Sequence, residues 1–172
     1  MKKNSFIGSY VTLFLLSALT GSSIFSCKEK NKDVIKPKTI TDIILENNDF
    51  TILREIIKGT GMTDALRSQE FTLFAPNDAA FRSSNITNAS VITSLPKDSA
   101  LSFVKYHILA KRTEYKDLQK GPLKMLNGKT VLVSKTGSSD SITVIGRAYV
   151  ILKNLNADNG VIHVIDRTLT VK

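Results

Sequence analysis

The chain has 172 residues, with 24 Lys and Arg, 15 Asp and Glu, one cysteine and a formal net charge of +9. One cysteine cannot form a disulfide within the chain, so internal disulfides play no part in its stability. The basic residues are scattered, without an Arg-rich helix, a basic-aromatic ladder or zinc-finger spacing, which argues against nucleic-acid binding. This charge favours attraction to anionic lipid or acidic polysaccharide instead.

Residues 1–26 have the layout of an export signal peptide. Lys2 and Lys3 precede an apolar run at residues 10–19, and the segment holds no acidic residue. The run is too short to span a bilayer core of about 30 Å, which needs roughly 20 apolar residues. We therefore expect this segment to be cleaved, or the protein to be anchored by lipid, in place of a transmembrane helix.

Cys27 follows Ile24-Phe25-Ser26, an order that resembles the lipobox of bacterial lipoproteins, although a small or β-branched residue is usual where Phe25 stands. The resemblance implies that Cys27 carries acyl chains, such as palmitate, which would hold the protein on a membrane without crossing it. The alternative is a free or buried thiol, but the charged stretch KEKNKD that follows offers nothing to bury it. Lys28 is not the aspartate of an inner-membrane retention signal, so we expect an exported protein on the outer membrane or cell surface.

Residues 27–38 are interpreted as the lipidated cysteine and a charged tether. Residues 39–172 have the length of one domain and show no internal repeat. Without residues 1–26 the chain keeps 22 basic and 15 acidic residues, a net charge of +7.

The first half of this domain predicts helices. Residues 41–48 and 62–68 favour short helices, and in residues 49–61 the apolar positions repeat at intervals of three and four. Asp49 is the expected N-cap of that middle helix, and Gly59 and Gly61 are its expected stop. FTLFA at 71–75 predicts a strand that ends at Pro76, and a turn at Asn77-Asp78 is expected to start a short helix.

The second half predicts one more helix and then strands. Residues 88–95 are weakly helical and residues 96–109 more strongly so, with Pro96 suited to the first turn. Asn127-Gly128 between two apolar runs predicts a hairpin. Further strands are expected at 141–145, 148–152, 161–165 and 168–171, with a turn at 158–160. The predicted class is α+β, with helices first and then a mostly antiparallel sheet.

Three stretches together carry a family resemblance: FTLFAPNDAAF at 71–81, YHIL at 106–109 and NGVIHVIDRTL at 159–169. In order and spacing they resemble the two long motifs and the Tyr-His motif of the fasciclin domain family, over about residues 39–171. The resemblance implies a wedge-shaped β-sandwich with a cluster of helices, used at cell surfaces for adhesion and ligand binding and not for catalysis. Where some members have an Asp-Ile pair, this chain has Asn154-Leu155, so an integrin-type role through a metal site is not expected.

The motif residues are expected to be structural. Strand alternation puts His163 on one face with Val161 and Ile165, which favours a packed, hydrogen-bonded histidine, and puts Asp166 on the other face. Asp78 is expected to cap the helical turn that follows it, and Asp166 to form an ion pair or bond to backbone. The full set of motif positions is Phe74, Pro76, Asp78, Phe81, Asn159, Gly160, His163 and Asp166.

Tyr106 and His107 are the candidate partner-binding residues. Adjacent positions on a helix point about 100° apart, so both are not expected to be equally buried. One interpretation packs one of them in the core while the other bonds to a neighbouring loop. The other, implied by the family motif, makes the surface around them part of a partner site.

Other chemistry has little support in the sequence. His107 and His163 are the only candidate bases, without a G-x-S-x-G elbow, so no enzyme is expected unless the fold brings them together with a carboxylate. Two isolated histidines are a poor start for a metal site, and residues 154–160 lack the closing acid of a calcium loop. No nucleotide-binding motif occurs, and no cofactor is expected.

The leading hypothesis is therefore a lipid-anchored adhesion or binding module, at the cell surface or in the periplasm, that recognises a surface protein or polysaccharide. The alternative is a carrier of a small apolar ligand of the lipid or carotenoid type, which would need an open apolar groove between helices and sheet.

Overall fold

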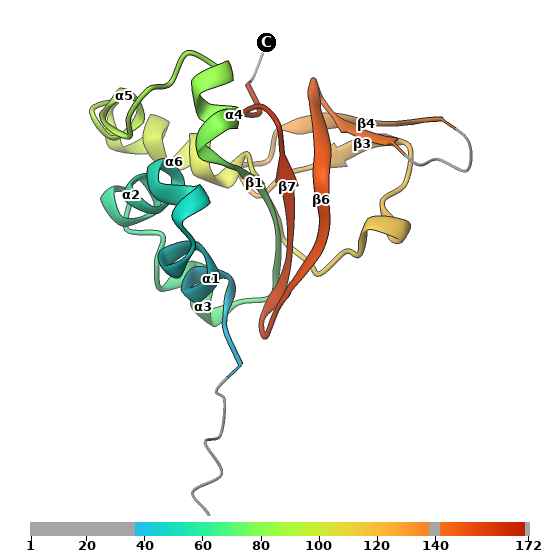
Figure 1. Ribbon diagram of the computed structural model, residues 1–172, viewed down its shortest axis with the longest axis horizontal. Coiled ribbons are helices and arrows are strands. Elements are labelled where there is room, and N and C mark those ends of the chain that lie inside the picture. Colours follow the sequence, from blue (N-terminus) through green and yellow to red (C-terminus); the bar gives the residue numbers. More distant parts are fainter. Residues whose placement is uncertain (1–36, 138–141, 171–172) are drawn as a thin grey trace, which may run out of the picture. The chain divides into compact units, whose positions relative to one another are not determined.

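A mixed sheet of seven strands organises the part of the chain that the computed structural model describes, residues 37–137 and 142–170 (Figure 1). The strand order is β2-β1-β7-β6-β5-β4-β3. Cys27 and the predicted signal peptide lie outside these residues, as does nearly all of the predicted tether. The strands are β1 Phe71–Pro76, β2 Ile108–Leu109, β3 Gly121–Lys124, β4 Thr130–Thr136, β5 Ile142–Ile145, β6 Ala148–Ala157 and β7 Gly160–Ile165.

Short helices fill the first half of the described chain, as the sequence predicts. In Figure 1 the α-helices gather on one side of β1 and β7. The α-helices are α1 Ile40–Glu46, α2 Thr51–Gly59, α3 Ala65–Ser68, α4 Asp78–Ser83, α5 Ser90–Thr93 and α6 Lys97–Lys105, and the 3-10 helices are η1 Asn48–Phe50 and η2 Tyr115–Asp117.

The two long sequence motifs become neighbouring parallel strands. Phe71 of β1 pairs with Gly160 of β7, and Phe74 pairs with His163. The other strand pairs are antiparallel, including the β3–β4 hairpin predicted from Asn127-Gly128. The sheet is thus mostly antiparallel, with one parallel pair, β1–β7, next to the edge strand β2.

Alternation along β1 and β7 divides the interior into two cores. Leu73, Ala75, Ile162 and Val164 face the helices and join the larger core with α1 and α2. Their neighbour Phe74 faces the opposite way, toward apolar residues of β4, β5 and β6. Strands β3 to β5 therefore turn back over this second face, which gives the wedge-shaped sandwich.

The predicted amphipathic helix is α2. Its four apolar residues at three- and four-residue spacing are all buried, and burying each such side chain contributes about 1.5–3 kcal/mol relative to leaving it exposed. These residues are Ile52, Leu53, Ile56 and Ile57.

Two predicted helix caps are wrong. Asp49 lies in η1 and does not cap α2, and Asp78 is the first residue of α4, whose N-cap is Asn77. The Asp78 carboxylate instead accepts hydrogen bonds from the Thr51 hydroxyl and, at 2.9 Å, from the backbone N–H of Ile52. Asp78 thus caps α2 from the neighbouring helix α4.

One predicted helix end and one predicted strand are also wrong. The helix expected to reach residue 109 ends at Lys105, because the chain turns there and Ile108–Leu109 pairs with β1 as β2. Thr168–Thr170 is not a strand. The backbone N–H of Thr168 bonds the Ser84 hydroxyl and that of Leu169 bonds the His107 ring, so they are not available for a ladder.

Candidate functional site

Tyr106 and His107 are both buried, with 6% and 2% of their surfaces exposed. The expectation that a helix would bury only one of them is wrong, because α6 ends at Lys105 and the two side chains leave from the turn after it. The Tyr106 hydroxyl donates a hydrogen bond to the carbonyl oxygen of Thr130, at 3.2 Å. Burial raises the pKa of the Tyr106 phenol.

Both ring nitrogens of His107 are engaged by backbone. Nε2 accepts a hydrogen bond from the N–H of Leu169 at 2.9 Å, which places the proton on Nδ1, and Nδ1 lies 2.9 Å from the carbonyl oxygen of Phe103. The ring also packs against that of Phe103, with centroids 4.8 Å apart. Burial lowers the pKa of His107 to about 4, so the ring is neutral at physiological pH.

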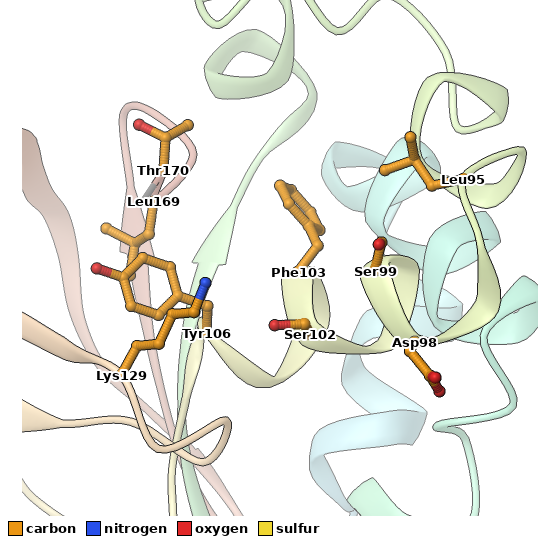
Figure 2. Close-up of a pocket in the computed structure, with 9 residues that line it drawn as sticks. All are labelled: Leu95, Asp98, Ser99, Ser102, Phe103, Tyr106, Lys129, Leu169 and Thr170. Atoms are coloured by element: carbon orange, nitrogen blue, oxygen red, sulfur yellow. The ribbon is translucent and has the colours of Figure 1, made fainter. Parts of the chain in front are cut away.

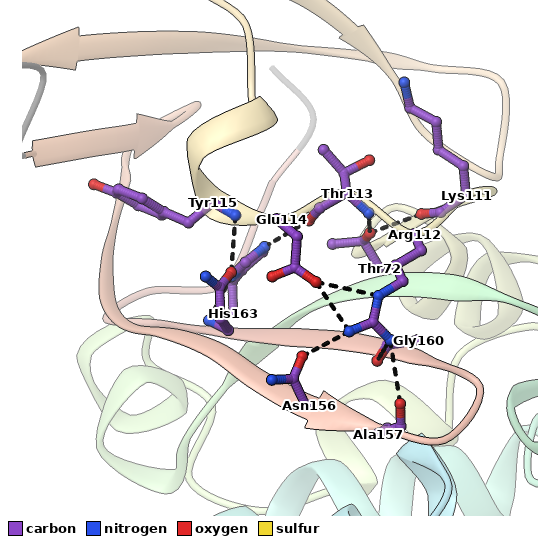
Figure 3. Close-up of polar contacts among 11 residues, drawn as sticks. Thr72, Lys111, Arg112, Thr113, Glu114, Tyr115, Asn156, Ala157, Gly160 and His163 are labelled. Carbon is purple, nitrogen blue, oxygen red and sulfur yellow. Dashed lines mark hydrogen bonds and ion pairs between the residues drawn. The ribbon is translucent and has the colours of Figure 1, made fainter.

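His163 is held in the same way within the second core (Figure 3). Nδ1 accepts the N–H of Asn154 at 3.2 Å, and Nε2 lies 3.0 Å from the carbonyl oxygen of Thr113. The ring stacks obliquely on Phe74, at a centroid distance of 5.7 Å. Burial lowers the pKa of His163, although the Thr113 bond opposes the shift.

The two histidines are therefore structural residues in different parts of the domain. His107 ties α6 to the segment after β7, and His163 ties β7 to β6 and to the segment before η2. With both ring nitrogens bonded to backbone, neither is available as a general base. Within residues 37–137 and 142–170 no three His, Cys or acidic side chains gather as a metal site.

Asn159 and Gly160 join the β6–β7 turn to the helices. The Asn159 side chain accepts the N–H of Ile40 at 2.9 Å and donates to the carbonyl oxygens of Leu66 and Gln69. Gly160 has φ of 154°, and a Cβ there would lie 2.0 Å from the carbonyl oxygen of Phe71. Only glycine fits where β1 and β7 begin their parallel pairing.

The remaining motif residues also have structural places. Phe74 and Phe81 are fully buried, Pro76 ends β1, and the Asp166 carboxylate accepts the backbone N–H of Tyr149 at 2.7 Å. Asp166 is thus bonded to backbone, one of the two arrangements expected from the sequence.

Asn154 stands at an irregular part of β6 with φ of +52°, a left-handed conformation that asparagine tolerates better than most residues. Its side chain accepts the N–H of Tyr115 at 2.8 Å. Asn154 is therefore a structural residue in this chain.

Arg112 is a residue that the sequence did not single out. Its guanidinium donates to the carbonyl oxygens of Gly160 and Ala157, to the Asn156 side chain and to the Glu114 carboxylate (Figure 3). It fastens the segment before η2 to the β6–β7 turn. Nothing in the local sequence distinguishes it from other surface arginines, because every partner except Glu114 is far along the chain.

A groove of two adjoining pockets runs past Tyr106, which with Leu169 and Thr170 lines both of them. The first pocket, about 440 Å³, lies against α6 and Lys129 (Figure 2). The second, about 460 Å³, lies against β4 and the β5–β6 turn and reaches Leu132 and Arg147. The two pockets are called the Tyr106 groove below.

Three large apolar side chains are exposed where β4 and β6 face away from the second core. Leu132 is 59% exposed, Tyr149 49% and Ile151 54%, while Val131, Val133, Ala148 and Val150 beside them point into the core. Leu152, next to Ile151 at an irregular part of β6, is also exposed, at 51%. Pro122 of β3 lies opposite Leu132, and Lys124, two residues on, shares that face. The outer strand face is defined as Pro122, Lys124, Leu132, Tyr149 and Ile151.

Charge is divided between the two halves of the domain. Residues 97–172 contain 13 Lys and Arg and 6 Asp and Glu, whereas residues 39–96 contain 4 and 7. The half that carries β2 to β7 and the outer strand face is therefore basic, and the helical half before it is acidic.

Fold and motif together define a fasciclin-type domain. The family model described as Fasciclin domain matches residues 48–171, so the chain belongs to that family. Protein sll1483 of Synechocystis sp. is 29% identical over 76% of this chain and 72% of its own length. Immunogenic protein MPB70 of Mycobacterium bovis is 32% identical over 72% of this chain and 64% of its own. Human periostin is 33% identical over 76% of this chain but only 16% of its own length.

A solved FAS1 domain pair from the insect cell adhesion molecule fasciclin I has the same fold. It superposes with a TM-score of 0.62 at 18% identity, over 78% of this chain and 51% of the other, so the chain spans about half of that pair. No helix among the described residues is long and apolar enough to cross a membrane.

Proposed function

We propose that this protein is a lipid-anchored adhesion module that binds an acidic polysaccharide at the cell surface through its basic strand half. The observation that carries the proposal is the outer strand face, where exposed apolar side chains lie in the positively charged half of the domain. Membership of a family that includes an insect cell adhesion molecule supports an adhesive role.

The outer strand face suits a charged glycan. Clusters of exposed apolar side chains mark interaction sites more often than single ones do. An exposed tyrosine such as Tyr149 offers a flat apolar face and a polar hydroxyl, which together suit a sugar ring. Lys124 on the same face and Arg147 in the adjacent turn supply positive charge, and neither side chain has an ion pair with another described residue.

Dextran sulfate and neutral dextran give a matched test of this proposal. We expect a chain that begins at Lys28 to bind immobilised dextran sulfate and not dextran, and the binding to weaken as salt is raised, because salt screens exposed charges. Tyr149→Ser should weaken binding to dextran sulfate without changing thermal stability. Equal binding to both polymers, or to neither, would refute the acidic glycan, and selective capture of an acidic protein would replace it with a protein partner.

Lipid anchoring through Cys27 is the second part of the proposal. It rests on the lipobox-like sequence, since Cys27 lies outside the described residues. Cys27→Ala should move the protein from the membrane fraction to the soluble fraction of the cells that produce it, whereas Ser26→Ala, which keeps the cysteine, should not. Membrane association that survives Cys27→Ala would rule out this anchor.

A second candidate function is that of a carrier for a small apolar ligand. The observation that favours it is the Tyr106 groove, whose pockets fall in the range of about 300–1,000 Å³ that is usual for ligand sites.

A further inference from the structure

The Tyr106 groove combines apolar walls with one exposed cation in each of its two pockets. Lys129 follows the Asn127-Gly128 turn and lines the first pocket, and Figure 2 shows its side chain beside the Tyr106 ring, opposite α6. Its ammonium group has no hydrogen bond or ion pair with any residue of the described ranges. Arg147 lines the second pocket and likewise has no ion pair with a described residue.

The walls around Lys129 are mostly apolar or uncharged. Phe103, Tyr106, Leu95 and Leu169 supply apolar surface from both sides of the groove, and the hydroxyls of Ser99 and Ser102 are the neutral polar groups of α6. Asp98 is the one acidic residue in the lining of the first pocket. In Figure 2 its carboxylate points away from Lys129 and from the aromatic rings.

We infer that the Tyr106 groove binds an anionic amphiphile, a molecule with one apolar chain and a carboxylate or phosphate head. The head lies at the Lys129 ammonium group, and the apolar chain lies along Phe103, Tyr106 and Leu169. This inference rests on the second candidate function, that of a carrier, and adds the chemical class of the ligand.

The positive charge of Lys129 favours an anionic ligand over a neutral one. A wholly apolar ligand would cover the Lys129 ammonium group without giving it a partner, which costs free energy. A carboxylate or phosphate gives that group a charge-assisted hydrogen bond, which is stronger than a bond between neutral groups. The preference for an anionic head should be about tenfold in affinity or more.

Ligands with a common dodecyl chain separate the head from the chain. Binding to the chain that begins at Lys28, which retains the whole compact unit Lys36–Lys172, would be measured by calorimetry below the critical micelle concentration. Dodecanoate and dodecyl phosphate should bind more tightly than dodecanol, and dodecylammonium should bind most weakly. The ratio of dodecanoate to dodecyl phosphate affinity then identifies whether the natural head is a carboxylate or a phosphate.

Two variants locate the bound ligand. Lys129→Met removes the charge and keeps an apolar stem, so it should weaken dodecanoate binding about tenfold and leave dodecanol binding unchanged. The control Lys116→Met makes the same change at an exposed lysine of η2 outside the groove and should have no effect. Ser99→Trp fills the first pocket from an exposed position on α6 and should prevent binding of every dodecyl ligand.

The outcomes distinguish this inference from the carrier function on which it rests. If dodecanol binds as tightly as dodecanoate and Lys129→Met changes neither, the inference fails while the carrier function stands. If no dodecyl ligand binds, both fail. Dodecanoate binding that survives Ser99→Trp would place the ligand elsewhere and also overturn the inference.

Discussion

His107 illustrates at the residue scale how burial and backbone bonding together fix one protonation state. Its Nε2 accepts the N–H of Leu169, and a proton on Nε2 would break that bond and place a charge in the core. His163 has an equivalent arrangement with Asn154 and Thr113. Acid should therefore act on this fold through its two histidines.

We predict that the protein loses stability between about pH 6.5 and pH 4 because of His107. The unfolded chain takes up a proton at the ordinary pKa of 6.5, whereas the folded chain does so only near its lowered pKa of about 4. The free energy of unfolding should fall by about 3 kcal/mol across this window, with His163 acting in the same direction.

NMR titration of the imidazole resonances, together with urea unfolding at several pH values, measures this effect. We expect the His107 resonance to remain that of a neutral ring until well below its ordinary pKa. The free histidine signal of the urea-unfolded chain is the internal control. A His107 resonance in the folded protein that titrates together with that control would contradict the account.

The sequence predicts individual residues well where strand alternation decides their place. His163 shares a face with Ile165 in the second core because side chains in a strand alternate. Prediction from the sequence fails at Tyr106 and His107, because their burial depends on where α6 ends. It also overlooks Arg112, most of whose partners come from the β6–β7 turn.

At the scale of elements, α4 and α2 are joined by a cap. The Asp78 carboxylate accepts the N–H group of Ile52, the second residue of α2, so α4 must be in place before α2 is fully capped. A side chain that is distant in sequence thus supplies a group that most helices obtain from their own N-cap residue.

We predict that Asp78→Ala lowers the free energy of unfolding by about 1 kcal/mol, the usual cost of losing a cap. Asp49→Ala is the matched control, because Asp49 is the N-cap favoured by the sequence but is exposed in η1, and its effect should stay within about 0.5 kcal/mol. Urea unfolding of both variants measures the difference. A larger loss at Asp49 than at Asp78 would show that the local cap is the real one.

Short-range pairing is predictable from the sequence and long-range pairing is not. Asn127-Gly128 fixes the β3–β4 hairpin through a local turn. The parallel pairing of Phe71–Pro76 with Gly160–Ile165 has no local signal, because more than eighty residues separate the strands. The family resemblance alone connected these motifs.

At the scale of the whole domain, positive charge and most of the exposed large apolar side chains lie in the same half. The strand-rich half combines its excess of basic residues with the exposed Leu132, Tyr149 and Ile151. In the acidic helical half, most of the large apolar side chains are buried in the larger core. Composition alone gave the net positive charge. Its concentration in one half matters because an extended acidic polymer would approach that half and be repelled by the other.

A matched pair of charge reversals tests the proposed surface most directly. Arg147→Glu, in the turn beside the outer strand face, and Arg82→Glu, at an exposed position on α4, change the net charge equally and remove no ion pair among the described residues. The measurement is the affinity of each variant for dextran sulfate at physiological ionic strength. We predict a loss of about fivefold or more for Arg147→Glu and little change for Arg82→Glu, since salt confines the interaction to charges within about 8 Å. Equal losses in the two variants would mean that net charge alone drives binding, and would contradict a binding site on the strand half.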